Sequence, residues 1–170
     1  MNAFMNDFLV ALENTRFGLF MRESDSLWGF PGILTTHAFA YCFLVATNMI
    51  VSLRILGFAK SIPLKPLGRL FSVMWFGLIL TALTGVPLVI MLAEKRVPNP
   101  ILWFKLLLIF VATPMMWKFQ KKVFNDPSVN ESNMPSFARK MAACQIALWL
   151  LIMIFGRLIP YSATIIGDGY

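Results

Sequence analysis

The sequence is poor in the residues from which metal, redox and disulfide sites are built. Its 170 residues include one histidine, His37, and two cysteines, Cys42 and Cys144. Both cysteines lie inside apolar stretches and form no Cys-x-x-Cys pair. We therefore expect them to be small packing residues, without a disulfide framework or a cysteine metal site.

Acidic residues are also scarce. The chain has 8 Asp and Glu against 15 Lys and Arg, and no carboxylate falls within its long apolar stretches. The absence of carboxylates from these stretches argues against a proton-driven transporter of the usual design, which needs intramembrane carboxylates. The sequence also lacks a glycine-rich phosphate loop and a Ser–His–Asp set, so nothing in it indicates an enzyme.

Hydrophobic residues, in contrast, make up 58% of the chain, and the mean hydropathy is +0.72. They form four stretches long enough to cross a bilayer. These lie at about residues 31–57, 66–93, 100–119 and 137–159. Short connections make consecutive helices antiparallel. The predicted fold class is therefore all-α, an integral membrane four-helix bundle with up-down-up-down topology.

Residues 1–27 are predicted to form an amphipathic helix in the membrane interface, followed by a polar joint. Apolar residues such as Phe4 share one helical face, and polar residues such as Glu13 lie opposite. No basic residue precedes the apolar part and no small-residue cleavage pattern follows it, so we do not expect a cleaved signal peptide. The bundle should occupy residues 28–161, with residues 162–170 as a short periplasmic tail.

Basic residues are concentrated on one side of the predicted bundle. They flank the first and third connections, as Arg54, Lys60, Lys65 and Arg69, and as Lys118, Lys121, Lys122, Arg139 and Lys140. The positive-inside rule places these connections in the cytoplasm and both termini outside. We expect a multi-pass protein of the bacterial inner membrane with periplasmic termini. The net charge of +7 then indicates contact with membrane lipids and no nucleic-acid partner.

The first span carries an informative polar face. At 100° per residue, His37 and Tyr41 share this face with two further polar residues. Polar groups in a membrane turn toward other helices or a water-filled cavity, so this face should line the inside of the bundle. The residues predicted to form hydrogen bonds between helices are Asn48, Ser52, Thr81 and Thr84.

Three side chains from three spans are predicted to converge in the periplasmic half of the bundle. His37 lies about 9 Å below the start of the first span, and Lys105 about 7 Å below the start of the third. Arg157 lies about one turn from the end of the fourth span, with Glu94 as the nearest counter-charge. Tyr41, one turn beyond His37, completes this candidate ligand-binding cluster. The cluster suits an anionic group, a quinone carbonyl or a lipid headgroup.

Simpler interpretations stay open for each member of the cluster. Lys105 and Arg157 are close enough to the surface to extend toward it. His37 is too short to do so, but a lone intramembrane histidine often only bonds to a neighbouring helix. Tyr41 is equally compatible with an ordinary core.

A b-type haem is the cofactor to weigh, because four-helix membrane bundles commonly hold it between histidines. A single histidine excludes a bis-histidine site within one chain. The remaining pair is His37 with Met153, which should lie level with it in the fourth span. The chain has 11 methionines, however, and methionine is a common filler of apolar cores. A haem held between two copies of His37 is a further alternative.

Several short motifs occur in a characteristic order and spacing. They are Trp28, Pro31 and His37, then Ser52-Leu53-Arg54-Ile55-Leu56-Gly57, then Phe104-Lys105-Leu106, and finally Gly156-Arg157-Leu158-Ile159. This pattern resembles a family of small bacterial four-helix integral membrane proteins, distantly similar to copper-resistance D type membrane domains. The resemblance implies an inner-membrane location and draws attention to His37, Arg54, Lys105 and Arg157. The family usually has an acidic residue where this chain has Ser52. Copper binding gains no support, because one histidine makes a poor copper site.

The expected function is that of a non-catalytic integral membrane subunit. The chain is too small to enclose a pathway easily, and aromatic and methionine side chains crowd its outer faces. We therefore expect a homo-oligomer or a subunit of a larger inner-membrane assembly, respiratory or redox in kind. The alternatives are a b-type haem electron-transfer protein with His37 as axial ligand, and a quinone- or lipid-binding subunit.

Overall fold

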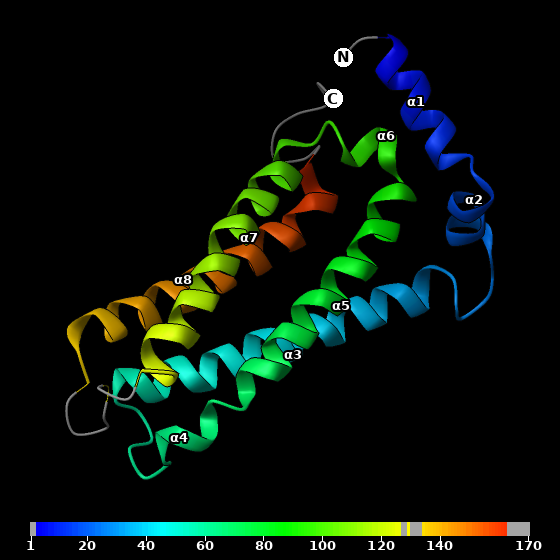
Figure 1. Cartoon of the computed structure of the whole chain (residues 1–170). Helices are drawn as coiled ribbons and strands as arrows, with labels where there is room; N and C mark the ends of the chain where they lie inside the picture. Colours follow the sequence, from blue (N-terminus) through cyan, green and yellow to red (C-terminus); the bar gives the residue numbers. More distant parts are fainter. Residues whose placement is uncertain (1–2, 127–128, 130–133, 163–170) are drawn as a thin grey trace.

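The computed structural model describes residues 3–126, 129 and 134–162, which contain helices and no strand (Figure 1). The four long helices are α3 (Phe30–Leu56), α5 (Leu70–Ile90), α7 (Pro100–Phe119) and α8 (Ser136–Leu158). By length and composition, the segments that contain them can each cross a membrane. The predicted all-α four-helix membrane bundle is confirmed, and the chain is a multi-pass membrane protein.

Two helix boundaries differ clearly from the predicted ones. Helix α5 begins only at Leu70, because the basic segment before it forms a separate short helix, α4 (Leu64–Leu67). The connection predicted at 120–136 begins later, because α7 continues into the π-helical turn η1 (Gln120–Phe124). The predicted tail at 162–170 lies outside the described residues except for residue 162.

Local sequence signals explain where the long helices begin and end. Pro31 stands in the first turn of α3, where its missing N–H costs nothing. Gly57 ends that helix with a φ of 105°, a left-handed conformation that glycine adopts without strain. The Asn99 side chain caps α7 by accepting a hydrogen bond from the Ile101 N–H at 3.0 Å.

The N-terminal segment forms two helices, α1 (Ala3–Glu13) and α2 (Arg16–Glu23), where one was predicted. The break has a local cause, because the Thr15 hydroxyl accepts from the Gly18 N–H at 3.2 Å and so starts a new helix. Glu13 then holds this segment against the short helix α6 (Ala93–Arg96). Its Oε1 accepts from the Glu94 N–H at 2.7 Å, and its Oε2 lies 3.4 Å from Arg22 Nη1.

Helix α3 is the centre of the bundle, because it packs along both α5 and α8, and α8 in turn packs along α7. Helices α5 and α7 have few contacts with each other. Some side-chain contacts join them at the end of the bundle that carries η1. There the Phe71 and Phe119 rings meet edge to face at 6.1 Å. The Trp75 Nε1–H also donates to Gln120 Oε1 at 3.0 Å. The bundle is therefore open between α5 and α7.

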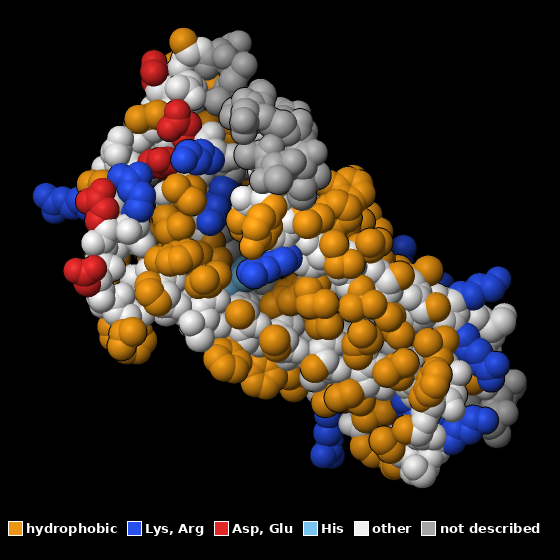
Figure 2. Space-filling model, turned by 180° about the vertical axis from the view of Figure 1, so that it is seen from behind, with side chains coloured by type: hydrophobic (Ala, Val, Ile, Leu, Met, Phe, Trp, Pro, Cys, Tyr) orange, Lys and Arg blue, Asp and Glu red, His pale blue; other side chains and the backbone are white. Residues whose placement is uncertain are grey.

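The outer surface matches a protein surrounded by lipid. Large hydrophobic side chains are exposed along all four long helices, among them Phe43, Phe76, Phe110 and Ile154. Figure 2 shows hydrophobic side chains over the middle of one face, acidic side chains only at one end, and Lys and Arg at both ends. In water such a surface would drive aggregation, whereas in a bilayer it is the expected boundary.

Candidate functional site

A cavity of about 240 Å³ lies between α3, α7 and α8, where the sequence predicts the ligand-binding cluster. Its lining includes His37 and Tyr41 from α3, Lys105 from α7, and Met153 and Arg157 from α8. The structure thus brings together four of the five candidate cluster residues and the methionine considered as a haem ligand. We call this space the cationic cavity.

The imidazole of His37 bonds across the bundle to α5. Its Nδ1 lies 2.9 Å from the Thr84 hydroxyl, and that hydroxyl donates its own proton to the Leu80 carbonyl at 2.7 Å. The contact links α3 to α5 in either tautomer of the ring, because a hydroxyl can both donate and accept. This contact fixes the orientation of the ring at the wall of the cavity.

Lys105 turns inward instead of extending along the lipid-facing surface. A Cβ added at Gly156 would lie 3.2 Å from the Lys105 ammonium, so the missing side chain of this glycine leaves room for the charge between α7 and α8. Lys105 and Arg157 reach the cavity from two different helices, beside His37. Arg96 lies outside the membrane-spanning helices, and burial lowers the pKa of its guanidinium. The basic side chains in the lining itself are Lys105 and Arg157.

Among the residues that the structure describes, no carboxylate lines the cationic cavity to balance this charge. The side chain of Glu94, the predicted counter-charge, is exposed on α6 and is not part of the lining. Only the backbone N–H of Glu94 is bound, by Glu13. Arg157 is exposed at the cavity, and within the described part of the chain neither Arg157 nor Lys105 forms an ion pair. Within the described residues, the cavity thus has an excess of basic side chains.

A buried polar network below the cavity joins three of the long helices. Its centre is Gln145 on α8, which is completely buried and which the sequence reasoning missed. Gln145 Oε1 accepts from Trp149 Nε1–H at 2.8 Å and from Asn48 Nδ2–H at 3.4 Å, and its Nε2 lies 3.5 Å from the Ala112 carbonyl. The Tyr41 hydroxyl donates to the Trp149 carbonyl at 2.7 Å. The available signal was a single glutamine within an otherwise apolar span.

The predicted helix–helix contacts fall into two groups. Asn48 and Thr84 form hydrogen bonds with side chains of another helix. The hydroxyl oxygens of Ser52 and Thr81 are buried, and neither has a hydrogen-bond partner among the described residues. Arg54, to which the resemblance draws attention, lies near the far end of α3 and outside the cavity. It holds the following turn by donating to the carbonyls of Lys60 and Ile62, at 3.2 and 2.5 Å.

Comparison of the chain with protein-family models, curated proteins and solved structures finds no match. Within the described residues, no group of three or more His, Cys, Asp or Glu side chains could hold a metal ion.

Proposed function

We propose that this protein is a non-catalytic membrane subunit that binds the anionic headgroup of a membrane amphiphile in the cationic cavity. The observation that carries the proposal is the convergence of Lys105 and Arg157 beside His37, with no carboxylate among the described residues of the lining. Charges held in a membrane are normally paired with one another. A phosphate or carboxylate group would supply the missing negative charge and accept hydrogen bonds from both cations.

The size of the cavity favours a headgroup over a whole cofactor. Ligand and cofactor sites typically enclose about 300–1,000 Å³, and this cavity encloses about 240 Å³. The lining residues Met153 and Arg157 are exposed at the surface of the bundle. The hydrocarbon part of an amphiphile can therefore stay in the surrounding lipid while its headgroup enters.

The b-type haem alternative has one observation in its favour and one against it. His37 and Met153 line the same cavity, as a His–Met axial pair would require. Nδ1 of His37 is engaged by Thr84, so iron could only approach Nε2. The volume is below that of usual cofactor sites, and a macrocycle would have to push the helices apart. We therefore rank haem behind an anionic headgroup. A quinone also ranks behind the anionic headgroup, because a neutral quinone brings no negative charge to the cavity.

The proposed location is the bacterial inner membrane, with both termini in the periplasm. Most Lys and Arg residues lie at the end that carries α4 and η1, whereas the other end also carries acidic residues such as Glu13 and Glu23. This asymmetry fits the positive-inside rule, and the family resemblance supports the same location.

The orientation can be tested with single cysteines in a variant that lacks Cys42 and Cys144. We expect a cysteine at Asn125, beside η1, to resist a membrane-impermeant thiol reagent applied to intact cells. A cysteine at Lys95, on α6, should react under the same conditions. Labelling at position 125 without labelling at position 95 would reverse the proposed topology.

The binding function can be tested by native mass spectrometry of the full chain released from its own membranes. We expect the wild type to retain a phosphate- or carboxylate-bearing amphiphile. Lys105→Met should reduce the retained fraction about tenfold or more, because a hydrogen bond to a charged group contributes about 1.5–3 kcal/mol. Lys95→Met, which removes an exposed lysine of α6, is the matched control and should bind as the wild type does.

The same sample separates the alternatives. Retention of a neutral quinone, or a Soret band that disappears in His37→Ala, would replace the headgroup proposal with the quinone or haem alternative. Equal retention by Lys105→Met and Lys95→Met would remove the cationic cavity as the binding site. Because the protein is proposed to work in an assembly, the same mass spectrum should also show a second copy of the chain, or a different protein, bound in stoichiometric amount. A lone monomer at every detergent concentration would contradict that part of the proposal.

A further inference from the structure

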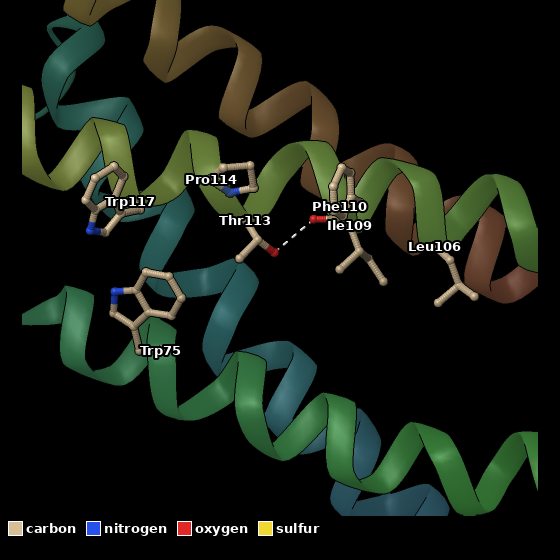
Figure 3. A pocket seen from close by; sticks show the side chains of 7 residues that line it. All are labelled: Trp75, Leu106, Ile109, Phe110, Thr113, Pro114 and Trp117. Atoms are coloured by element: carbon tan, nitrogen blue, oxygen red, sulfur yellow. Dashed lines mark hydrogen bonds between the residues drawn. The ribbon is translucent and has the colours of Figure 1, made fainter.

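A second cavity, independent of the cationic cavity, lies in the opening between α5 and α7. It encloses about 700 Å³, well within the range of ligand sites. Figure 3 shows its walls, with Trp75 projecting from α5 and the other labelled side chains belonging to α7. Trp117 and Trp75 lie toward one end of the groove, and Leu106 lies at the other.

Two of the polar side-chain groups in the walls of this groove are already engaged in hydrogen bonds. The Thr113 hydroxyl donates to the Ile109 carbonyl at 2.8 Å, and the Trp75 Nε1–H is occupied by Gln120. The remaining contacts come from apolar side chains such as Phe110. In a membrane a groove with mainly apolar walls suits hydrocarbon or another apolar surface.

The length of the groove corresponds to the hydrocarbon thickness of one bilayer leaflet. From Leu106 to Trp117 is 11 positions, or about 16 Å at 1.5 Å per residue. Half of the roughly 30 Å hydrocarbon core is about 15 Å. An acyl chain lying along α7 would therefore reach the headgroup level at Trp117, where α7 approaches its end.

Lysine side chains gather at this end of the groove. Lys121 Nζ lies 5.2 Å from the centre of the Trp117 ring, over the ring that lines the groove. Lys118, one residue beyond Trp117, is exposed. An apolar groove that ends at the Lys121 ammonium group, with the exposed Lys118 nearby on the same helical segment, is complementary to a phospholipid with a negatively charged headgroup.

A second copy of the chain fits this groove less well. Helices associate in membranes through small residues that let their backbones approach. Both glycines of α5 already face α3: an added Cβ would lie 2.9 Å from the Ala40 carbonyl oxygen at Gly77 and 3.3 Å from the His37 ring at Gly85. The groove itself is walled by bulky side chains, including two tryptophans. Its shape suits a thin, flexible acyl chain.

We propose that the groove between α5 and α7 binds an acyl chain of an anionic glycerophospholipid, whose phosphate lies against Lys118 and Lys121. This site lies at the opposite end of α7 from Lys105. It does not depend on the function proposed for the cationic cavity.

Fluorescence quenching by lipids brominated in the middle of the acyl chain tests this proposal. The full chain is placed in phosphatidylcholine vesicles that contain a small, equal fraction of brominated phosphatidylglycerol or brominated phosphatidylcholine. The contribution of Trp117 is obtained by comparison with Trp117→Phe, and that of the exposed control Trp103 by comparison with Trp103→Phe. We expect the anionic lipid to be preferred at Trp117 by about tenfold, because two lysines attract it, and to show no preference at Trp103.

The lysine variants decide between specific binding and general contact with lipid. The double variant Lys118→Gln/Lys121→Gln should lose the preference at Trp117, whereas the matched variant Lys140→Gln should keep it. Equal quenching of Trp117 by both lipids in the wild type would overturn the proposal. Protection of Trp117 from both lipids in a dimeric sample would assign the groove to a second copy. Circular dichroism of each variant confirms that the helices are intact.

Discussion

Replacement of Gly77 by leucine is expected to separate α3 from α5 and to lower the free energy of unfolding by about 3 kcal/mol or more. The first added atom, the Cβ, would already lie 2.9 Å from the Ala40 carbonyl oxygen and 3.1 Å from the Leu44 Cβ. Both belong to the core of α3, where backbone cannot move without displacing the other contacts of the central helix. Loss of helical signal with increasing SDS in mixed micelles measures the change.

Alanine variants test whether the loss of stability comes from the steric clash with α3. Alanine favours a helix over glycine by about 1 kcal/mol, so a substitution without a steric clash should stabilise the protein. At Gly85 the nearest atom to an added Cβ is a carbon of the His37 ring, at 3.3 Å. We therefore expect Gly85→Ala to be neutral or slightly stabilising and Gly77→Ala to be destabilising. A Gly77→Ala protein as stable as Gly85→Ala would show that α3 and α5 do not approach as closely as described.

The membrane fold could be predicted from the sequence because its main signals are local. Long apolar stretches identify spanning helices, and Pro31 and Gly57 mark the ends of the first one within a residue or two. The polar face of that helix was also predictable, because helical periodicity alone groups His37, Tyr41 and Asn48. The structure turns these three side chains toward α5 and α8.

Other features depend on which helices become neighbours, and periodicity does not contain that information. The opening between α5 and α7 arises because α3 and α8 pack together at the centre of the bundle. Glu94 was placed at the cavity from its position along the chain, but the short helix α6 leaves its side chain exposed. The role of Gln145 cannot be recognised from the sequence, because it depends on Trp149 and Asn48 facing this glutamine in the folded bundle.

The Gln145→Leu variant is expected to lose about 2–3 kcal/mol of stability. Leucine fills a similar volume but leaves the Trp149 Nε1–H and the Asn48 amide without their shared acceptor in a fully buried place. An orphaned buried donor costs about 1–3 kcal/mol in soluble proteins, whereas polar contacts measured in a membrane protein average about 0.6 kcal/mol and reach about 1.7. Two orphaned donors near the upper membrane value give the expected loss.

The control for this variant is Gln120→Leu, which removes one bond to a partly exposed tryptophan, Trp75, and should cost less than 1 kcal/mol. Adding Trp149→Phe to Gln145→Leu removes one orphaned donor, so the double variant should lose less stability than the two single losses added together. Additive losses would mean that the Gln145–Trp149 bond contributes nothing.

The same variant links the buried network to the cationic cavity. Gln145, Trp149, Met153 and Arg157 recur every four residues, so they follow one another along one side of α8. The network at Gln145 and Trp149 therefore sets the rotation of α8 that presents Met153 and Arg157 to the cavity. We expect Gln145→Leu to weaken retention of the amphiphile while leaving Lys105 in place, and Gln120→Leu to leave retention unchanged. Native mass spectrometry under conditions where both variants remain folded measures this, and equal retention by the two would show that the network stabilises the bundle without positioning its binding residues.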